Sequence, residues 1–148
     1  MNLKDKINAD LKDAMKSQDK VRLNTVRSIR ALILEYEKSG SEKELSPEDE
    51  IKLLSSAAKK RKDAVEQYSN AGRQELADNE LKELEIIQSY LPAQLSDEEI
   101  IDKIKIIASD VGASAKADFG KLMGAAMKEL KGKADGNKIR ETVEKILS

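Results

Sequence analysis

The stretch FGKLMGAAMKELKGKADGNKIR, residues 119–140, decides how the rest of the chain is interpreted. On a helix with about 100° between successive residues, its apolar side chains gather on one side: Phe119, Leu122, Met123, Ala126, Met127 and Leu130. The opposite side holds Lys121, Gly124, Ala125 and Lys128. The stretch therefore predicts a helix with one core-facing side and one side on which lysines surround two residues with almost no side chain.

This helix is expected to be the middle one of three short helices near the end of the chain. Periodic apolar residues predict helices at about 97–111, 118–131 and 137–147. Ser96 and Glu99 have the spacing of a capping box, and Asp118 is expected to cap the second helix. Gly112 and Gly132 are natural helix stops. Three such helices predict a minimal bundle.

Four longer amphipathic helices are predicted before this bundle, at about 2–16, 20–37, 47–72 and 74–90. Asp19 and Ser46 are expected N-caps, and Gly72 is an expected stop. The first helix is expected to bury Leu3, Ile7, Leu11 and Met15, and the fourth Leu76, Leu81, Leu84, Ile87 and Leu91.

A proline stop followed at once by a new helix cap predicts a domain boundary. Pro92 ends the fourth helix, the segment 91–95 is expected to act as a hinge, and Ser96 opens the next helix. The fold expected is all-α. It has an N-terminal helical-hairpin domain, residues 1–92, followed by a small three-helix C-terminal tail domain, residues 96–148.

Composition excludes several classes of protein. The 148 residues are 39 % apolar and 37 % charged with a net charge of −1, so a globally basic nucleic-acid binder is excluded. With no cysteine and no histidine, Ser-His-Asp and Cys-His catalysis and the usual zinc ligands are excluded, and no metal or cofactor is expected. No signal-peptide or membrane-spanning run is found. A cytoplasmic protein that does not enter the membrane is the resulting expectation.

Two charged clusters outside the tail have a simple structural interpretation. The acids on the fourth helix could form a general acid–base pair or hold magnesium, but they are scattered through a sequence equally rich in lysine and no aromatic or glycine-rich pocket accompanies them, as on an ordinary solvated helix. The run Lys59-Lys60-Arg61-Lys62 points in different directions on a helix, which also favours a solvated face. A secondary basic patch on the second helix comprises Lys20, Arg22, Arg27 and Arg30.

The tail carries the best candidate binding surface. Between Lys116 and Arg140 there are seven basic and three acidic residues, a local charge of +4. Such a surface attracts phosphates. The predicted RNA-binding residues are Lys121, Lys128, Lys131, Lys133, Lys138 and Arg140, with Gly120 and Gly124 permitting close approach. Alternatively, the Gly124–Ala125 face lets another helix or a protein partner pack closely, and pattern alone does not choose between the two.

Two longer stretches carry a family resemblance. KKRKDAVEQYSNAGRQELADNELKELEIIQSYLPAQLSDEE, residues 59–99, and DFGKLMGAAMKELKGKADG, residues 118–136, resemble the GatB/YqeY family. The chain is similar to the stand-alone YqeY-like proteins, which are related to the C-terminal tail of the GatB component of the glutamyl/aspartyl-tRNA amidotransferase. The family motif matches Gly120-Lys121, Met123-Gly124, Met127-Lys128 and Lys131-Gly132-Lys133-Ala134.

The resemblance implies an accessory protein that binds tRNA or another structured RNA. Its family label is that of a carbon–nitrogen ligase with glutamine as amido-N-donor. The chain lacks the catalytic cradle of the GatB component, so no catalytic residue is assigned and catalysis by the chain alone is not expected. Two alternatives remain: a helical protein–protein adaptor, and a component of a glutamine-dependent tRNA amidotransferase.

Overall fold

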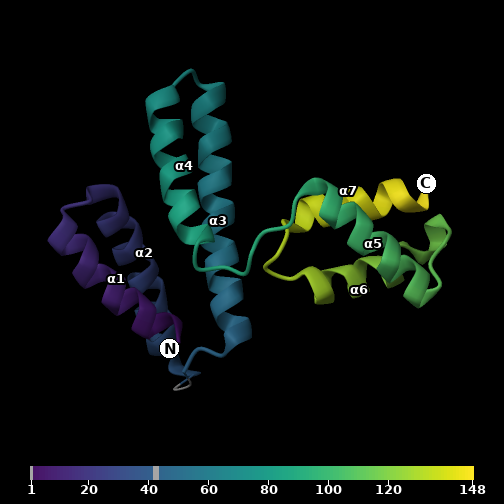
Figure 1. Ribbon diagram of the computed structural model, residues 1–148, viewed down its shortest axis with the longest axis horizontal. Coiled ribbons are helices and arrows are strands. Elements are labelled where there is room, and N and C mark those ends of the chain that lie inside the picture. The colour runs from purple at the N-terminus through teal and green to yellow at the C-terminus, as the bar shows by residue number, and fades with distance from the viewer. Residues whose placement is uncertain (1, 42–43) are drawn as a thin grey trace. The chain divides into compact units, whose positions relative to one another are not determined.

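The computed structural model describes residues 2–41 and 44–148, and within these ranges the protein is built from helices, with no strand (Figure 1). The predicted all-α class is confirmed. The α-helices are α1 (Leu3–Ser17), α2 (Lys20–Tyr36), α3 (Pro47–Asn70), α4 (Gln74–Gln88), α5 (Asp97–Val111), α6 (Phe119–Leu130) and α7 (Gly136–Leu147). A short π-helix, η1 (Glu37–Ser41), extends α2, and a 3-10 turn, η2 (Lys116–Asp118), precedes α6.

Local signals account for where most helices begin and end. The Asp19 carboxylate accepts from the backbone N–H of Arg22, and Ser46 and Ser96 each form a capping box. Gly72 and Gly112 have φ of 73° and 71°, the left-handed conformation that stops a helix and that glycine adopts without a side-chain clash. These predicted caps and stops are confirmed.

The chain divides into two compact units, Met1–Leu91 and Pro92–Ser148. The expected domains, 1–92 and 96–148, remain a prediction about independent folding. In the N-terminal unit, side chains from all four helices form one buried cluster: Leu3, Ile7, Val26, Ile29, Ile33, Leu54, Ala58, Leu84 and Ile87.

A hydrogen bond connects the end of this unit to α1, because the Tyr90 hydroxyl donates to the Asp10 carboxylate. Burial is the main cause that raises the pKa of Tyr90.

Parts of the predicted core of this unit are wrong. Leu76 and Leu81 are 42 % and 43 % exposed, and Met15 is 50 % exposed. Ala77 and Ala14 are buried instead, at 1 % and 0 %. A contact between two helices covers only a narrow stripe of each, and small residues let the axes come close, so larger side chains beside the stripe stay in solvent.

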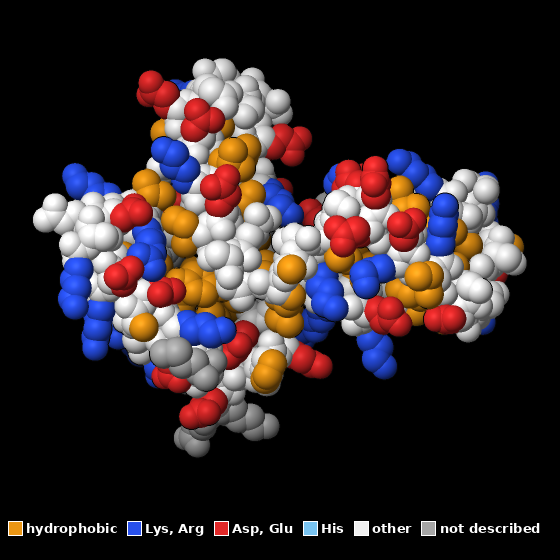
Figure 2. Space-filling model, viewed as in Figure 1, with side chains coloured by type: hydrophobic (Ala, Val, Ile, Leu, Met, Phe, Trp, Pro, Cys, Tyr) orange, Lys and Arg blue, Asp and Glu red, His pale blue; other side chains and the backbone are white. Residues whose placement is uncertain are grey.

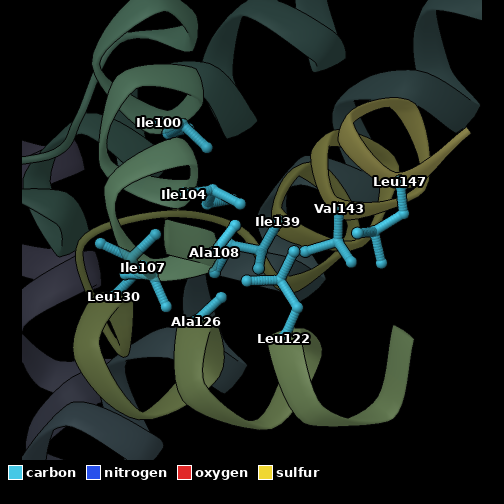
Figure 3. Close-up of a cluster of buried hydrophobic side chains, with 10 residues drawn as sticks. All are labelled: Ile100, Ile104, Ile107, Ala108, Leu122, Ala126, Leu130, Ile139, Val143 and Leu147. Atoms are coloured by element: carbon cyan, nitrogen blue, oxygen red, sulfur yellow. The ribbon is translucent and has the colours of Figure 1, made fainter. Parts of the chain in front are cut away.

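The C-terminal unit has its own core, contributed by all three helices (Figure 3). Ile104, Leu122, Ala126, Ile139 and Val143 are each fully buried. Figure 3 shows the side chains of α5, α6 and α7 pointing toward one another between the ribbons. This core fixes one side of α6 and leaves the other side free to form a surface.

Candidate nucleic-acid interface

The exposed face of α6 includes three of the four residues that the sequence placed on it, Lys121, Gly124 and Lys128. Leu122, Ala126 and Leu130 are 0 to 2 % exposed and point into the core of the C-terminal unit. Residues on the other side of the helix remain exposed: Gly120, Lys121, Gly124, Met127 and Lys128. We call these five residues the α6 face. Met127 was expected in the core but is 38 % exposed at the edge of this face, close to Gly136 at the start of α7.

The two glycines of the α6 face have open space where a side chain would be. A Cβ atom added at Gly120 or at Gly124 would meet no atom within 4 Å. Neither residue has the positive φ that would require glycine. The interpretation that Gly124 lets a helix of this chain pack closely therefore finds no support in the described residues. Glycine in a helix costs about 0.8–1.0 kcal/mol relative to alanine, and no internal contact of Gly124 offsets this cost.

Ala125 does not belong to the same open surface. It is half-buried and packs against the core cluster of the C-terminal unit. The sequence grouped Ala125 with Gly124, but one residue corresponds to about 100° of rotation on a helix. The predicted Gly124–Ala125 face is therefore narrower than expected, and its open part is at Gly124.

A basic loop, residues 131–135, follows α6 and is held in a defined shape. Gly132 has a φ of 76°, and the Lys133 N–H donates to Leu130 O at 2.9 Å. The Gln94 side-chain amide donates to Gly132 O at 2.7 Å, and the Leu95 N–H donates to Lys133 O at 2.9 Å. Residues 94 and 95 thus form part of the C-terminal unit, and they fix the loop in which Lys133 is exposed and Lys131 half-buried.

The last two predicted residues lie on α7 and are already paired with acids. Lys138 Nζ lies 3.0 Å from a carboxylate oxygen of Asp97, and this hydrogen bond raises the pKa of Lys138. Arg140 Nε lies 3.4 Å from a Glu144 oxygen. Residues two positions apart in sequence lie about 160° apart around a helix axis. Lys138 and Arg140 therefore point to different sides of α7. Lys138 lines a groove between α5 and α7, together with Ile101 and Lys145.

The structure thus divides the eight predicted residues into two sets. Gly120, Lys121, Gly124 and Lys128 share the α6 face, and Lys131 and Lys133 continue from it in the basic loop. Lys138 and Arg140 belong to α7 and have acidic partners. On the side of the molecule visible in Figure 2, basic and acidic side chains are interspersed over this unit, in agreement with its mixed sequence.

Sequence reasoning missed two residues that shape this surface, Gln94 and Asp97, and assigned a different role to a third, Asp118. Gln94 and Asp97 act through contacts about forty positions away in the chain, for which the sequence carries no local signal. Asp118 was expected to cap α6, but its carboxylate accepts from the Ser114 and Ala115 N–H groups at 3.0 and 3.1 Å. These bonds lower the pKa of Asp118 and close the turn before α6.

Residues 2–41 and 44–148 contain neither a membrane span nor a metal-binding cluster. No helix there is long and apolar enough to cross a membrane. No group of three or more His, Cys, Asp or Glu side chains there is arranged to hold a metal ion.

The chain is similar to several fungal proteins named "Altered inheritance of mitochondria protein 41, mitochondrial". One from Pyrenophora tritici-repentis is 29 % identical, covering 96 % of this chain and 79 % of its own length. One from Clavispora lusitaniae is 33 % identical over 84 % and 71 %. One from Kluyveromyces lactis is 31 % identical over 76 % and 65 %.

These names contradict the expected cytoplasmic location, because they point to mitochondria. The expectation rested on the lack of a signal peptide, and such a lack does not select one compartment.

A family model described as "Yqey-like protein" matches residues 4–147, nearly the whole chain. The match includes the two stretches on which the family resemblance rests, 59–99 and 118–136. The chain belongs to the YqeY-like protein family.

Proposed function

We propose that this protein is an accessory factor that binds the phosphate backbone of tRNA or another structured RNA. The contact surface consists of the α6 face and the basic loop, with Lys121, Lys128, Lys131 and Lys133 as the lysines that approach phosphates. Gly120 and Gly124 let the backbone of the RNA come close to the helix. Lys138 and Arg140 are paired with Asp97 and Glu144 on different sides of α7, so the proposed contact does not depend on them.

The observation that carries this proposal is the bare glycine surface between lysines. Nothing in the described chain lies within 4 Å of a Cβ at Gly124, so no contact there offsets the cost of a helical glycine, and this open position supports close approach by another molecule. The face carries no aromatic side chain on which an unpaired base could stack. This favours recognition of backbone shape over sequence. The names of the relatives support a mitochondrial setting for this RNA.

The test is fluorescence anisotropy with labelled, unfractionated tRNA at increasing salt. Phosphate contacts predict affinity that falls steeply with salt, and each lost lysine contact reduces the slope of log K against log salt by about one. Reversal of Lys121, Lys128 and Lys131 to Glu should abolish binding. The matched control reverses Lys103, Lys105 and Lys145 to Glu, which gives the same change in net charge on exposed positions of α5 and α7.

Two results would end the proposal. One is tRNA affinity that stays constant from low to high salt. The other is equal loss of affinity in the α6-face variant and in the control variant, since this would mean that only the net charge matters. Circular dichroism of both variants is needed to show that the helices are retained.

A protein–protein adaptor is the second candidate, and exposed Met127 beside the glycines favours it. A stoichiometric protein partner that is retained after nuclease treatment and lost in Gly124→Leu would support this function. The third candidate, a component of a glutamine-dependent tRNA amidotransferase, requires amidation of mischarged tRNA that depends on this chain in a reconstituted mixture.

A further inference from the structure

We infer that a groove between α2 and α3 binds a small amphiphilic anion, a free carboxylate with an unbranched apolar chain. The groove has a volume of about 530 Å³ and is lined by side chains of both helices in the N-terminal unit. Ligand pockets commonly measure roughly 300–1,000 Å³. This site is separate from the α6 face and does not depend on the proposed RNA contact.

The residues that line the groove extend from Ser28 to Tyr36 on α2 and from Leu53 to Arg61 on α3. The two helices run antiparallel (Figure 1). The Tyr36 hydroxyl donates to Asp49 Oδ2 at 2.9 Å where α2 ends and α3 begins, which fixes one end. From Ser28 to Tyr36 the groove follows α2 for about 12 Å at 1.5 Å per residue. These dimensions suit an extended chain better than a compact ring system.

The floor of the groove is apolar. Leu32 from α2 and Leu53 and Ala57 from α3 line it and remain half-buried. Leu53 and Ala57 also pack on the core of the N-terminal unit, so their positions are fixed from below. Covering these side chains with an apolar chain removes further surface from water, which is favourable in proportion to the area covered.

Three donors lie at the end of the groove away from Tyr36, whereas the Ser39 hydroxyl at the Tyr36 end already donates to Tyr36 O. Lys60 and the hydroxyls of Ser28 and Ser56 line this end. Within the part of the chain that the structure describes, Lys60 makes no ion pair and the two hydroxyls make no hydrogen bond to protein. Arg61 also lines the groove, but its guanidinium is paired with Glu83 and Glu80, whose oxygens lie 3.4 and 3.7 Å from its Nε, so Lys60 supplies the positive charge for the ligand.

The charges set the direction of the ligand. Glu35 lines the groove toward the Tyr36 end and repels an anion there. A carboxylate therefore binds at Lys60, with the chain running over Leu32 toward Leu53. A cation with the same chain has two possible orientations, and both are unfavourable. In one, its charge lies against Lys60 and is repelled, and in the other, its apolar tail lies at the polar end of the groove.

The experiment is isothermal titration calorimetry of the 148-residue protein with dodecanoate, kept below the concentration at which dodecanoate forms micelles. Saturable binding of one dodecanoate is expected, with dodecyltrimethylammonium at least about tenfold weaker. Lys60→Glu and Leu32→Glu should each lose about tenfold or more in affinity. Lys60→Arg should retain binding. The matched control is Lys59→Glu, the exposed neighbour on α3 that does not line the groove.

Four results would overturn the inference. The first is no saturable binding by wild-type protein whose circular dichroism shows full helicity. The second is equal binding of the cationic amphiphile. The third is equal loss of affinity in Lys59→Glu and Lys60→Glu. The fourth is a dimer in sedimentation that Leu32→Glu converts to a monomer, since the groove would then be covered by a second copy of the chain.

Discussion

Replacement of Gly124 by alanine should make the protein more stable and a weaker RNA binder at the same time. The residue lies within α6, and a Cβ there meets nothing within 4 Å. Its φ is not positive, so alanine causes no backbone strain. Exchanging glycine for alanine in a helix interior then gains about 1 kcal/mol from helix propensity. For a small domain this corresponds to a rise in Tm of a few degrees.

The stability is measured by urea unfolding followed by circular dichroism. The midpoint should rise while the slope m stays constant, because the surface exposed on unfolding hardly changes. The tRNA affinity of the same variant is measured by anisotropy. We expect it to fall, since a methyl group now stands where the RNA backbone approaches most closely. Ser109→Ala on an exposed position of α5 is the matched control, with a gain in helix propensity and no change in RNA affinity.

The reasoning makes two separable claims about Gly124. A lower urea midpoint for Gly124→Ala would refute the claim that the position is bare in the folded chain. Unchanged tRNA affinity together with a higher midpoint would refute the claim that close approach at Gly124 is used for binding. Only the combination of a higher midpoint and weaker binding agrees with both.

Three further outcomes follow from the structure. Leu122→Ala should cost about 2–5 kcal/mol in the urea assay, since Leu122 is fully buried, and a cost similar to that of a surface change would contradict its place in the core. Burial raises the pKa of Glu83 beside Arg61, so protonated Glu83 stabilises the fold. This contribution to the free energy of unfolding is complete below about pH 4 and is lost as pH rises through the pKa of Glu83 in the folded protein. Glu83→Gln should therefore remove this loss, which urea midpoints measured at several pH values would show. The backbone hydrogen bonds of Asp118 and Glu99 lower the pKa of both, so stability should fall as pH drops below about 4, where these carboxylates become protonated; Glu99→Gln should weaken that fall.

Local sequence signals were sufficient for the helices and most of their ends. The Ser96–Glu99 capping box and the stop at Gly72 depend on residues within a few positions of one another, so they can be identified without knowledge of the fold. The buried side of α6 was likewise predictable from its period, with Met127 as an exception at the edge.

Contacts between distant residues were not predictable in this way. Leu76 and Leu81 satisfy the helical period, yet the narrow contact of the hairpin leaves them in solvent. For the candidate surface, the sequence identified the lysines of α6 but grouped Lys138 with them by proximity in the chain. The ion pair with Asp97 at 3.0 Å, which holds Lys138 at the groove between α5 and α7, depends on the packing of the bundle.

The hydrogen bonds from Gln94 and Leu95 to the basic loop have a consequence for dissecting the protein. A fragment cut at residue 96 keeps all three helices of the C-terminal unit and nearly all of its core. It loses the only two bonds among the described residues by which the segment before α5 holds Gly132 and Lys133. We expect a fragment that begins at Pro92 to retain the shape of the loop, whereas a fragment that begins at Ser96 keeps only the Lys133 N–H bond to Leu130 O among the loop bonds described above.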